Sequence, residues 1–570
     1  MTGTQYWTQH YLLFGHGLGV SCLLAALPIF TLLLVVGILR RAAWLAGVLG
    51  LVVTLLLATV GYRMPVPMAL SAAGMGVAFA LFPITWIIFW ALALFRVTVE
   101  TGQFAVIRDS IGQLTPDPRL QALLIAFALG AFLEGAAGFG TPVAIAATML
   151  VGLGFTPFRA SAICLIANTA PVAFGSLGIP IITLAATTGL PLARLSTATA
   201  AMCTPVAVLL PLYMLLATGG RRAVSGIWLP TLASGAIFGA VEVAVSVYLG
   251  PQLTDILASL SAIAALVLPL RWRPAPPAPG DLEGWPSRGI PGAVSGGRGN
   301  TAGVEPRAQS QPGATFRAAT FRAATFRAWM PYGLLVACVL LWGWSPVQRA
   351  LGGSTRLVPW PLLHDAVTRV PPIVRAPAPY HALFTLNLLA ASGTACMAAT
   401  LLSAVWLRLA PRRFVGILMG VSGQLGLPTL TVAAVLGLAF LMNYCGATAT
   451  LGLAFATTGR LFPFFSALLG WLGVFLTGSD TSANALFGSL PVVTATRLGF
   501  SPVLMAAANS SGGVMGKMIS LQTIAIAAAA TGLTAKEQAR LFRFTLRHSI
   551  ALAALTGGIA LGLAYVIHPR

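Results

Sequence analysis

The chain has 570 residues, of which 57% are hydrophobic and only 8% are charged, and its mean hydropathy is +0.89. Soluble globular proteins carry about 25% charged residues, so this composition excludes a water-soluble protein of this size and predicts a membrane protein. The formal net charge of +21 is spread over short arginine clusters between apolar segments. That pattern is typical of cytoplasmic loops and argues against nucleic-acid binding.

Apolar segments long enough to cross a bilayer recur along the whole chain, since a bilayer core of roughly 30 Å needs about 20 apolar residues in a helix. They are found at about 18–39, 42–61, 66–95, 120–150, 160–188, 197–218, 226–249, 255–270, 331–345, 382–407, 415–441, 445–475, 482–496, 503–530 and 549–566. Several are too long or too often interrupted by glycine and proline to be single straight helices. We therefore predict an all-α polytopic membrane protein with about 12 to 14 spans.

The segment 271–330 divides the chain into two halves, 1–270 and 331–570. It is rich in proline and glycine, holds eight arginines against three acids, and ends in three copies of ATFRA. Such a segment cannot bury enough apolar surface to fold alone, so we predict a mobile cytoplasmic loop. The Phe-Arg copies could bind anionic lipid, but a repeat insertion without function is the favoured explanation.

The arginine clusters also predict the orientation of the chain in the membrane. Arg40-Arg41, Arg221-Arg222, Arg412-Arg413 and the residues Arg540 to Arg547 are expected to face the cytoplasm, with both ends of the chain outside. Because no basic residue precedes Arg40, a cleavable signal peptide is not expected and the first apolar segment should remain as a span.

The two halves contain similar sequences in the same order, at about 130–190 and about 473–533. GAFLEG at 130–135 matches GVFLTG at 473–478, GFTP at 154–157 matches GFSP at 499–502, Asn168-Thr169 matches Asn509-Ser510, and TGL at 188–190 matches TGL at 531–533. We predict two repeated halves, each with a broken or re-entrant helix segment, which is the usual construction of a secondary transporter and its substrate site.

The predicted helix breaks lie at 135–142 and 477–484. The first reads GAAGFGTP, and the second, TGSDTSAN, is glycine or polar at seven of its eight positions. Broken helices persist in a membrane only where they line a cavity or are buried in protein, because the freed backbone groups must be satisfied. Both breaks are therefore candidate parts of a binding site.

These segments resemble the lactate permease family. The resemblance is carried by GAFLEGAAGFGTPVAI at 130–145, IANTAPVAFG at 166–175, LTGSDTS at 476–482, GGVMGKMIS at 512–520 and LFRFT at 541–545. It covers nearly the whole chain apart from 271–330, and it implies a proton-coupled importer of lactate and glycolate in the bacterial inner membrane. The chain departs from the family at Leu521, where proline is usual, and at Pro491, where glutamine is usual.

Three acids lie deep in apolar segments: Glu134, Glu242 and Asp480. Charge in the bilayer interior is costly, so such residues are candidates for function. Because burial favours the uncharged form of a carboxyl group, Glu134 and Asp480 are the predicted proton-coupling residues. The structural alternatives are that Glu134 ties the broken helix to a neighbour and that Asp480 caps a half-helix. For Glu242, outside both repeats, a structural or pore-lining role is favoured.

The remaining candidates would bind the substrate. Lys517, one of only two lysines, would hold its carboxylate or pair with an acid when the site is empty, unless it extends to the membrane interface. The predicted substrate-binding residues are Gly138, Gly140, Thr141, Asn168, Ser479, Thr481, Ser482, Asn484, Asn509, Lys517 and Gln522. The amides could instead satisfy broken-helix carbonyls, and helix N-termini at the breaks would themselves attract an anion.

No cofactor and no metal are predicted, since the six cysteines stand singly in apolar segments without a CxxC pair. A sodium-coupled carboxylate carrier is the first alternative, because the polar residues at 479–484 beside unwound backbone also suit a sodium ion. A membrane sensor or enzyme is less favoured, since HExxH and GxSxG motifs are missing. The sequence leaves the oligomeric state open.

Overall fold

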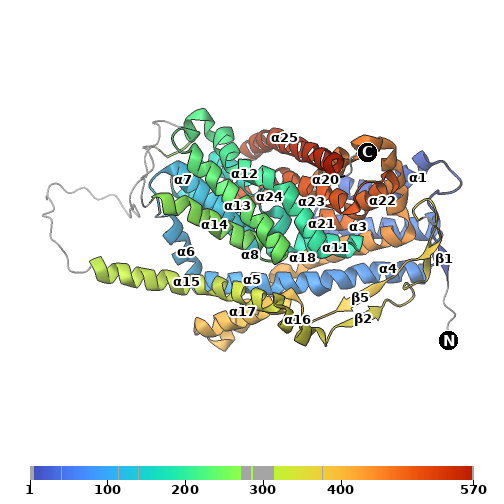
Figure 1. Ribbon diagram of the computed structural model, residues 1–570, viewed down its shortest axis with the longest axis horizontal. Coiled ribbons are helices and arrows are strands. Elements are labelled where there is room, and N and C mark those ends of the chain that lie inside the picture. Colours follow the sequence, from blue (N-terminus) through green and yellow to red (C-terminus); the bar gives the residue numbers. More distant parts are fainter. Residues whose placement is uncertain are drawn as a thin grey trace.

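Helices form nearly all of the regular structure in the computed structural model of the chain (Figure 1). The structure describes residues 6–39, 41–112, 114–138, 140–270, 284–286, 314–374 and 376–567. A chain in lipid must satisfy its backbone polar groups internally, and helices do so within one segment. The prediction of an all-α membrane protein is confirmed.

The elements of the first half are β1 (Trp7–Thr8), α1 (Leu18–Ala25), α2 (Leu27–Leu32), η1 (Leu33–Ile38), α3 (Ala43–Leu56), η2 (Leu57–Gly61), α4 (Val66–Phe79), η3 (Ala80–Thr85), α5 (Trp86–Glu100), α6 (Gln103–Gly112), α7 (Pro118–Ala122), η4 (Leu123–Leu129), α8 (Gly130–Ala136), α9 (Thr141–Gly152), α10 (Pro157–Ala167), η5 (Val172–Phe174), α11 (Gly175–Thr188), α12 (Leu192–Val224), α13 (Trp228–Tyr248) and α14 (Thr254–Leu270). The elements labelled η are short 3₁₀- or π-helical segments.

The elements of the second half are α15 (Ala314–Gly343), α16 (Ser345–Gly352), β2 (Arg356–Pro359), β3 (Val367–Arg369), β4 (Ala378–Pro379), β5 (Leu383–Leu386), α17 (Ser392–Trp406), α18 (Pro411–Cys445), α19 (Ala447–Phe455), η6 (Ala456–Leu461), α20 (Phe462–Thr477), α21 (Asp480–Phe487), α22 (Ser489–Leu498), α23 (Pro502–Gly516), η7 (Lys517–Ile519), α24 (Leu521–Thr531) and α25 (Ala535–Ile567).

Within the described residues, 11 helices are long and apolar enough to cross a membrane. The count becomes 12 if the pair Pro157–Ala167 and Val172–Thr188, bent by 66°, is one span. The number of spans therefore lies at or just below the low end of the expected range of about 12 to 14. The difference arises because some apolar segments form helices of only 10–17 residues, such as Thr254–Pro269 and Ser392–Trp406.

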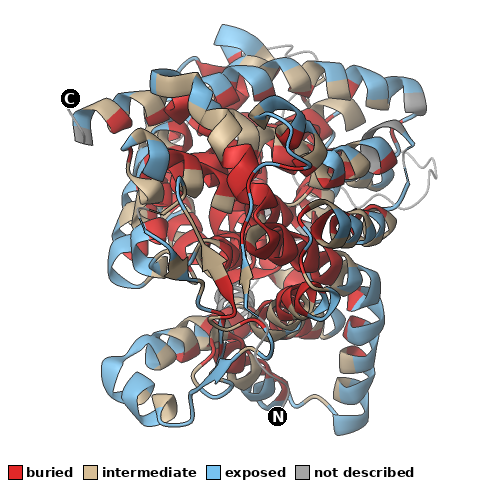
Figure 2. Cartoon of the chain, turned by 90° about the vertical axis from the view of Figure 1, so that its right-hand side faces the viewer, coloured by how far each residue is buried: buried red, intermediate tan, exposed pale blue. Residues whose placement is uncertain are grey.

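The helices divide into a buried centre and an outer layer (Figure 2). The span Pro118–Ala136 is 100% buried, whereas Leu18–Val35 is only 28% buried. Large apolar side chains remain exposed on outer helices, among them Val60, Val405 and Met419. Lipid rather than water is the natural surrounding of such a surface. Among the spans of the described residues, the one that carries Glu134 is fully buried.

The hydrophobic pattern did not predict two small sheets, which are formed by four strands in the connection before α17 and by β1 near the start of the chain. Strand β1 pairs in parallel with β3, β3 pairs antiparallel with β4, and β2 pairs antiparallel with β5. The expected apolar segment at 382–407 consequently begins as strand β5 and becomes helical only at Ser392. Gln9 joins this layer to the helices, because its Nε2 donates to the carbonyls of Asn443 and Tyr444 at the end of α18.

The structure describes only part of the predicted cytoplasmic loop. Residues 271–283 and 287–313 lie outside the described residues, while Gly284 and Trp285 contact the start of α10: the N–H of Thr156 donates to the carbonyl of Gly284, and Trp285 packs on Phe155. Helix α15 begins at Ala314 and includes the three ATFRA copies that we expected in the loop. Alanine and arginine favour helix, so the copies extend the following span.

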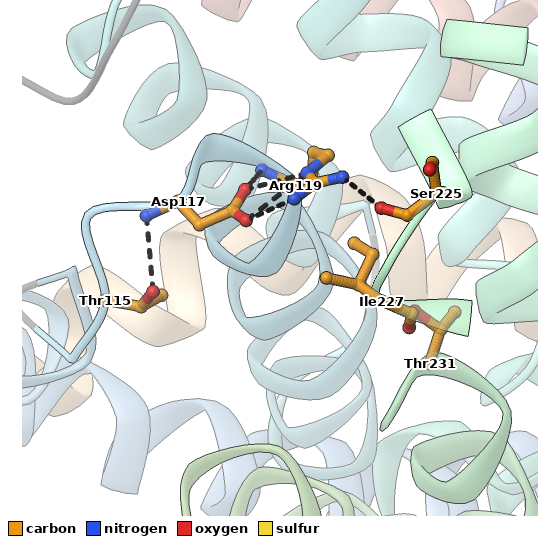
Figure 3. Close-up of polar contacts among 6 residues, drawn as sticks. All are labelled: Thr115, Asp117, Arg119, Ser225, Ile227 and Thr231. Carbon is orange, nitrogen blue, oxygen red and sulfur yellow. Dashed lines mark hydrogen bonds and ion pairs between the residues drawn. The ribbon is translucent and has the colours of Figure 1, made fainter. Parts of the chain in front are cut away.

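A buried ion pair fixes the start of the central span (Figure 3). The guanidinium of Arg119 is fully buried and pairs with both carboxylate oxygens of Asp117, at 2.8 Å from Nη2 to Oδ2. Its Nη1 donates to the carbonyl of Ser225 at 2.7 Å, in the turn between α12 and α13. Asp117 also caps α7 by accepting from the N–H of Arg119. The pair therefore connects the start of the central span to the neighbouring hairpin of α12 and α13.

The two predicted repeats contain similar elements in the same order. A helix that stops at a glycine-containing break, α8 or α20, is followed by helix α9 or by α21 and α22. Then come α10 or α23, each with a proline at its first position, a single 3₁₀ turn, η5 or η7, and finally α11 or α24, each ending at a left-handed glycine. The relation between the two units in space stays a prediction.

Candidate functional site

The first helix break is shorter than predicted and is packed closely against the side chain of Ser176. Helix α8 ends at Ala136, α9 begins at Thr141, and Gly138 and Gly140 have φ angles of +61° and +79°, which favour glycine. A Cβ on Gly138 would lie 2.0 Å from Oγ of Ser176, whose hydroxyl donates to the carbonyl of Ala137 at 3.2 Å. The side chain of Thr141 lies outside the described residues.

The second break is limited to Gly478 and Ser479. Gly478 has a φ of +72°, and Oγ of Ser479 accepts from the N–H of Ser482, so Ser479 is the N-cap of α21. Asp480 therefore lies in the first turn of a helix rather than in unwound backbone. The side chain of Gln522 crosses Gly478, where a Cβ would approach its Oε1 to 2.8 Å.

The structure brings Glu134 and Lys517 together, one from each predicted repeat. Nζ of Lys517 lies 3.8 Å from Oε1 of Glu134, and the two residues are 8% and 3% exposed. Lys517 therefore does not extend to the membrane interface. In the described part of the chain, Oε2 of Glu134 has no hydrogen-bond partner, so this oxygen is available to contact a ligand.

Glu134 is packed closely by a glycine of the same repeat. A Cβ on Gly175 would lie 3.0 Å from Oε1 of Glu134. Gly175 opens α11, whose next three residues, Ser176, Leu177 and Gly178, all have positive φ. Left-handed backbone at a non-glycine residue is costly and is kept only where the surroundings impose it. The strained turn places Ser176 against the first break, and Gly175 leaves room for the carboxyl group.

Asp480 lies at the centre of a hydrogen-bonded group with Asn484 and Ser510. Its Oδ2 accepts from Nδ2 of Asn484 and from Oγ of Ser510, both at 3.1 Å. Nδ2 of Asn484 also donates to Oγ of Ser510 at 2.9 Å and to the carbonyl of Pro180 at 3.2 Å, which joins α21 to α11 of the first repeat. Asp480 Oδ1 and Asn484 Oδ1 have no partner among the described residues.

Two further predicted residues are buried amides with unused hydrogen-bonding groups. Asn168 is 3% exposed and Asn509 is fully buried, and none of their side-chain nitrogen and oxygen atoms has a partner in the described part of the protein. Buried amides are usually hydrogen-bonded, so their free atoms suit a small polar ligand or ordered water. By contrast, Thr481 is half-buried without a side-chain hydrogen bond to a described residue, and Gln522 is exposed.

A further buried acid near Glu134 was missed by the sequence pattern. Asp255, at the start of α14, is 1% exposed, and neither of its carboxyl oxygens has a partner among the residues described. A Cβ added to Gly135 would lie only 2.7 Å from the Cβ of Asp255. Both Glu134 and Glu242 are near enough to interact with the charge of Asp255. The expectation of three deep acids was wrong, because Asp255 stands at the boundary of an apolar segment after Gly250-Pro251.

Glu242 lies beside this group. It is fully buried, its Oε2 accepts from the hydroxyl of Thr204 at 3.3 Å, and its Oε1 has no partner in the described residues. Four buried carboxyl groups, of Glu134, Glu242, Asp255 and Asp480, are thus accompanied by one buried ammonium, that of Lys517. Several unpaired carboxylates in an apolar interior would be very costly, so the arrangement suits a site that holds protons and accepts one small anion at Lys517.

Two histidines and an aspartate also come together, outside this site. Ligand atoms of His364, Asp365 and His381 lie within 4.8 Å of one another. Nδ1 of His364 accepts from the N–H of Ala382, so its proton lies on Nε2, which is 3.3 Å from Asp365. The imidazole and carboxylate atoms already satisfy one another, and we assign the group to the packing of the loop.

Comparisons with known proteins identify the family of the chain. The profile of the family described as L-lactate permease matches residues 21–567. The chain is 42% identical to the L-lactate permease of Bacillus subtilis (strain 168) over 562 residues, 96% of this chain and 97% of that protein. It is 41% identical to glycolate permease GlcA of Escherichia coli (strain K12) over 567 residues, 98% of each. The YdaH transporter structure of Alcanivorax borkumensis aligns with 87% of each chain at 14% identity, with a TM-score of 0.40, too low to support an argument.

Similarity at this level over nearly the entire length leaves no large part of the chain unmatched. The protein is a multi-pass membrane protein of the bacterial inner membrane. It belongs to the L-lactate permease family of transporters.

Proposed function

We propose that the chain imports lactate, and glycolate or similar small 2-hydroxy carboxylates, across the cytoplasmic membrane by proton symport. The observation that carries the proposal is the buried pair of Glu134 and Lys517, 3.8 Å apart and contributed by the two predicted repeats. The names of the relatives, L-lactate permease and glycolate permease, support the substrate class.

The substrate carboxylate replaces Glu134 as the partner of Lys517. A buried ammonium without an anion is costly, so a substrate anion at Lys517 is favoured when Glu134 takes up a proton and becomes neutral. The unused amide groups of Asn168 and Asn509 suit the hydroxyl of a 2-hydroxy acid. One proton and one monovalent anion then move together, so the net charge of the site is the same with and without substrate.

Asp480 and Asp255 are the further proton-holding groups of the proposal. Asp480 is held by Asn484 and Ser510 in the second repeat, and Lys517 acts on its charge as well as on that of Glu134. Asp255 lies behind Glu134 without a hydrogen-bond partner among the described residues. Movement of one repeat against the other would expose this site alternately to the two sides of the membrane.

A sodium ion is the second candidate for coupling. Asp480 Oδ1 and Asn484 Oδ1 are free of partners among described residues, and Ser510 Oγ and the carbonyl of Pro180 lie beside them. Oxygen atoms of these kinds are the usual ligands of hard cations. The arrangement is compatible with sodium, although the buried acids Glu134 and Asp480, which share one lysine, favour protons.

The test is labelled L-lactate uptake into proteoliposomes under an imposed inward proton gradient without sodium. Accumulation that collapses when a protonophore is added supports proton symport. Accumulation that needs an inward sodium gradient and survives the protonophore would replace the proton by sodium. Uptake that stops at equal concentrations under both gradients would contradict coupled transport.

A further inference from the structure

A basic cavity lies between α10 and α25, away from the buried acids. Its volume is about 530 Å³, and it is lined by two phenylalanines and four arginines: Phe158, Arg159, Arg540, Arg543, Phe544 and Arg547. Three of these arginines stand at positions 540, 543 and 547 of one helix, a spacing that places them on the same face. The cavity therefore presents several guanidinium groups to one open volume.

Aromatic contacts between the two helices shape the cavity. The guanidinium of Arg540 lies over the ring of Phe158, 4.8 Å from its centroid, and the ring of Phe544 meets Phe158 edge-on at 5.9 Å. Stacking of this kind orients a guanidinium while leaving its N–H groups available for other partners. The cavity is thus a packed feature shared by α10 and α25 rather than a chance gap between mobile side chains.

The arginines of α25 have few anionic partners. Among the described residues, Arg540, Arg543 and Arg547 make no ion pair within 4.0 Å, and all three are exposed. The nearest acid on the same helix, Glu537, already accepts from the N–H and hydroxyl of Thr534, at 2.9 and 2.7 Å. Like charges held together in one cavity repel each other, and a bound anion would relieve that repulsion.

The cavity faces the side of the predicted cytoplasmic loop. Arg159 lies beside Gly284 of that loop, where a Cβ would come within 3.4 Å of its Nε, and Thr156, three residues earlier, donates to the carbonyl of Gly284. The inner membrane surface and the soluble phosphate compounds of the cytoplasm would both reach the cavity there.

We propose that this cavity binds a phosphate or phosphodiester group bearing one or more negative charges. Guanidinium forks match phosphate oxygens with paired hydrogen bonds, and several of them favour a more highly charged anion than the single carboxylate proposed for Lys517. An anion held there contacts α10 of the first predicted repeat and α25, which follows the second. It therefore ties the two parts of the protein at their cytoplasmic ends.

The two sources of such a group, an anionic phospholipid and a soluble phosphate, are separated by the test. The full chain is placed in nanodiscs of phosphatidylcholine alone, and its melting temperature is measured after adding either cardiolipin to the nanodisc lipid or inorganic pyrophosphate to the buffer. A rise with cardiolipin only identifies a lipid site, and a rise with pyrophosphate identifies a soluble ligand. No rise in either arm would overturn the proposal.

Matched variants locate the binding. R543Q/R547Q removes two charges from the cavity, and R221Q/R222Q removes two exposed charges from the predicted cytoplasmic side elsewhere. The affinity for the effective ligand should fall about tenfold for each charge-assisted hydrogen bond lost in R543Q/R547Q and stay unchanged in R221Q/R222Q. Equal losses in both variants would mean general charge attraction and would overturn the site.

A charge-conserving variant covers the case in which R543Q/R547Q does not fold. R543K/R547K keeps both charges and loses the forked donors, so a specific site predicts weaker binding, whereas affinity equal to the parent chain contradicts it. The melting temperature reports binding and does not depend on transport. A protein that fails to take up lactate can therefore still show phosphate binding, and a failure to bind phosphate would not contradict the transport proposal.

Discussion

Glutamine at position 134 would keep the size and hydrogen-bonding capacity of the side chain while removing the group that takes up a proton. For E134Q we expect accumulation of lactate under a proton gradient to fall to the level of empty liposomes. Exchange of labelled for unlabelled lactate at equal pH should persist, because it needs no net proton transfer. The measurement is uptake and counterflow in the same proteoliposomes.

The exposed acid Glu100 supplies the matched control for this change, since E100Q removes the same charge from the surface. Accumulation should stay at the level of the parent chain in E100Q. Normal accumulation in E134Q would remove Glu134 as the coupling residue and direct attention to Asp480 and Asp255.

Lysine 517 should set the affinity for the substrate. In K517Q the substrate carboxylate loses a charge-assisted hydrogen bond, so we expect the KM for lactate to rise about tenfold or more. The variant K536Q, which alters the only other lysine, an exposed one, should keep the parent KM. The check is initial uptake rate against lactate concentration, and an unchanged KM in K517Q would show that the carboxylate binds elsewhere.

Much of the candidate site could be predicted at the level of single residues, and the reason is chemical. Glu134, Asp480 and Lys517 are charged residues inside apolar sequence, where charge is rare and costly, so they stand out. Asp255 does not, because it follows a glycine-proline turn and resembles an ordinary helix start. Its burial results from packing against Gly135, a contact far apart in the sequence that no local pattern contains.

Helices α20 and α23 pack with almost no space between their backbones. A Cβ on Gly512 would lie 2.0 Å from the carbonyl oxygen of Ala467, and all of its nearest neighbours are backbone atoms. Because backbone cannot move aside as a side chain can, G512A should destabilise the protein by about 1–3 kcal/mol. The measurement is thermal unfolding in detergent.

Gly558 of α25 supplies the matched control, G558A, because no atom lies within 4 Å of the position that a Cβ would take there. Alanine favours helix over glycine by roughly 1 kcal/mol, and this variant should be neutral or slightly stabilised. A G512A protein as stable as G558A would contradict close packing of α20 against α23.

The buried pair of Asp117 and Arg119 should stabilise the start of the central span. In D117N the guanidinium of Arg119, fully buried, loses its carboxylate, and breaking such a pair from one side costs about 3–5 kcal/mol. Thermal unfolding of D117N is compared with that of D109N. Asp109 pairs with Arg108 at the surface, with both side chains about half exposed, and exposed pairs contribute only about 0–1 kcal/mol. Similar melting temperatures for the two variants would mean that the buried pair adds little.

Helices were predicted well where a local sequence pattern is enough to determine them. Long apolar segments became helices, and both predicted breaks contain glycines at which the helices stop, with positive φ at Gly138, Gly140 and Gly478. The small sheets were missed because strands of two to four residues carry no readable alternation and depend on pairing with distant segments. The extent of α15 was missed because alanine-rich copies of ATFRA fit either a loop or a helix extension.

At the scale of the whole molecule, the family and the membrane location follow from composition and from motifs that run through the chain. The sequence alone does not show which residues of the two predicted repeats contact each other. The pairing of Glu134 with Lys517 and of Asn484 with the carbonyl of Pro180 joins residues more than 300 positions apart. Those contacts turn two separate motifs into one proposed site.

Lactate-driven proton movement tests the proposed symport most directly. Proteoliposomes loaded with a pH-sensitive dye, without sodium and with equal pH on both sides, receive external lactate, and empty liposomes correct for passive entry of lactic acid. Proton symport predicts rapid acidification of the lumen beyond the empty-liposome signal, and E134Q should abolish the excess. Entry of labelled lactate without excess acidification would contradict the account and establish transport that is not coupled to protons.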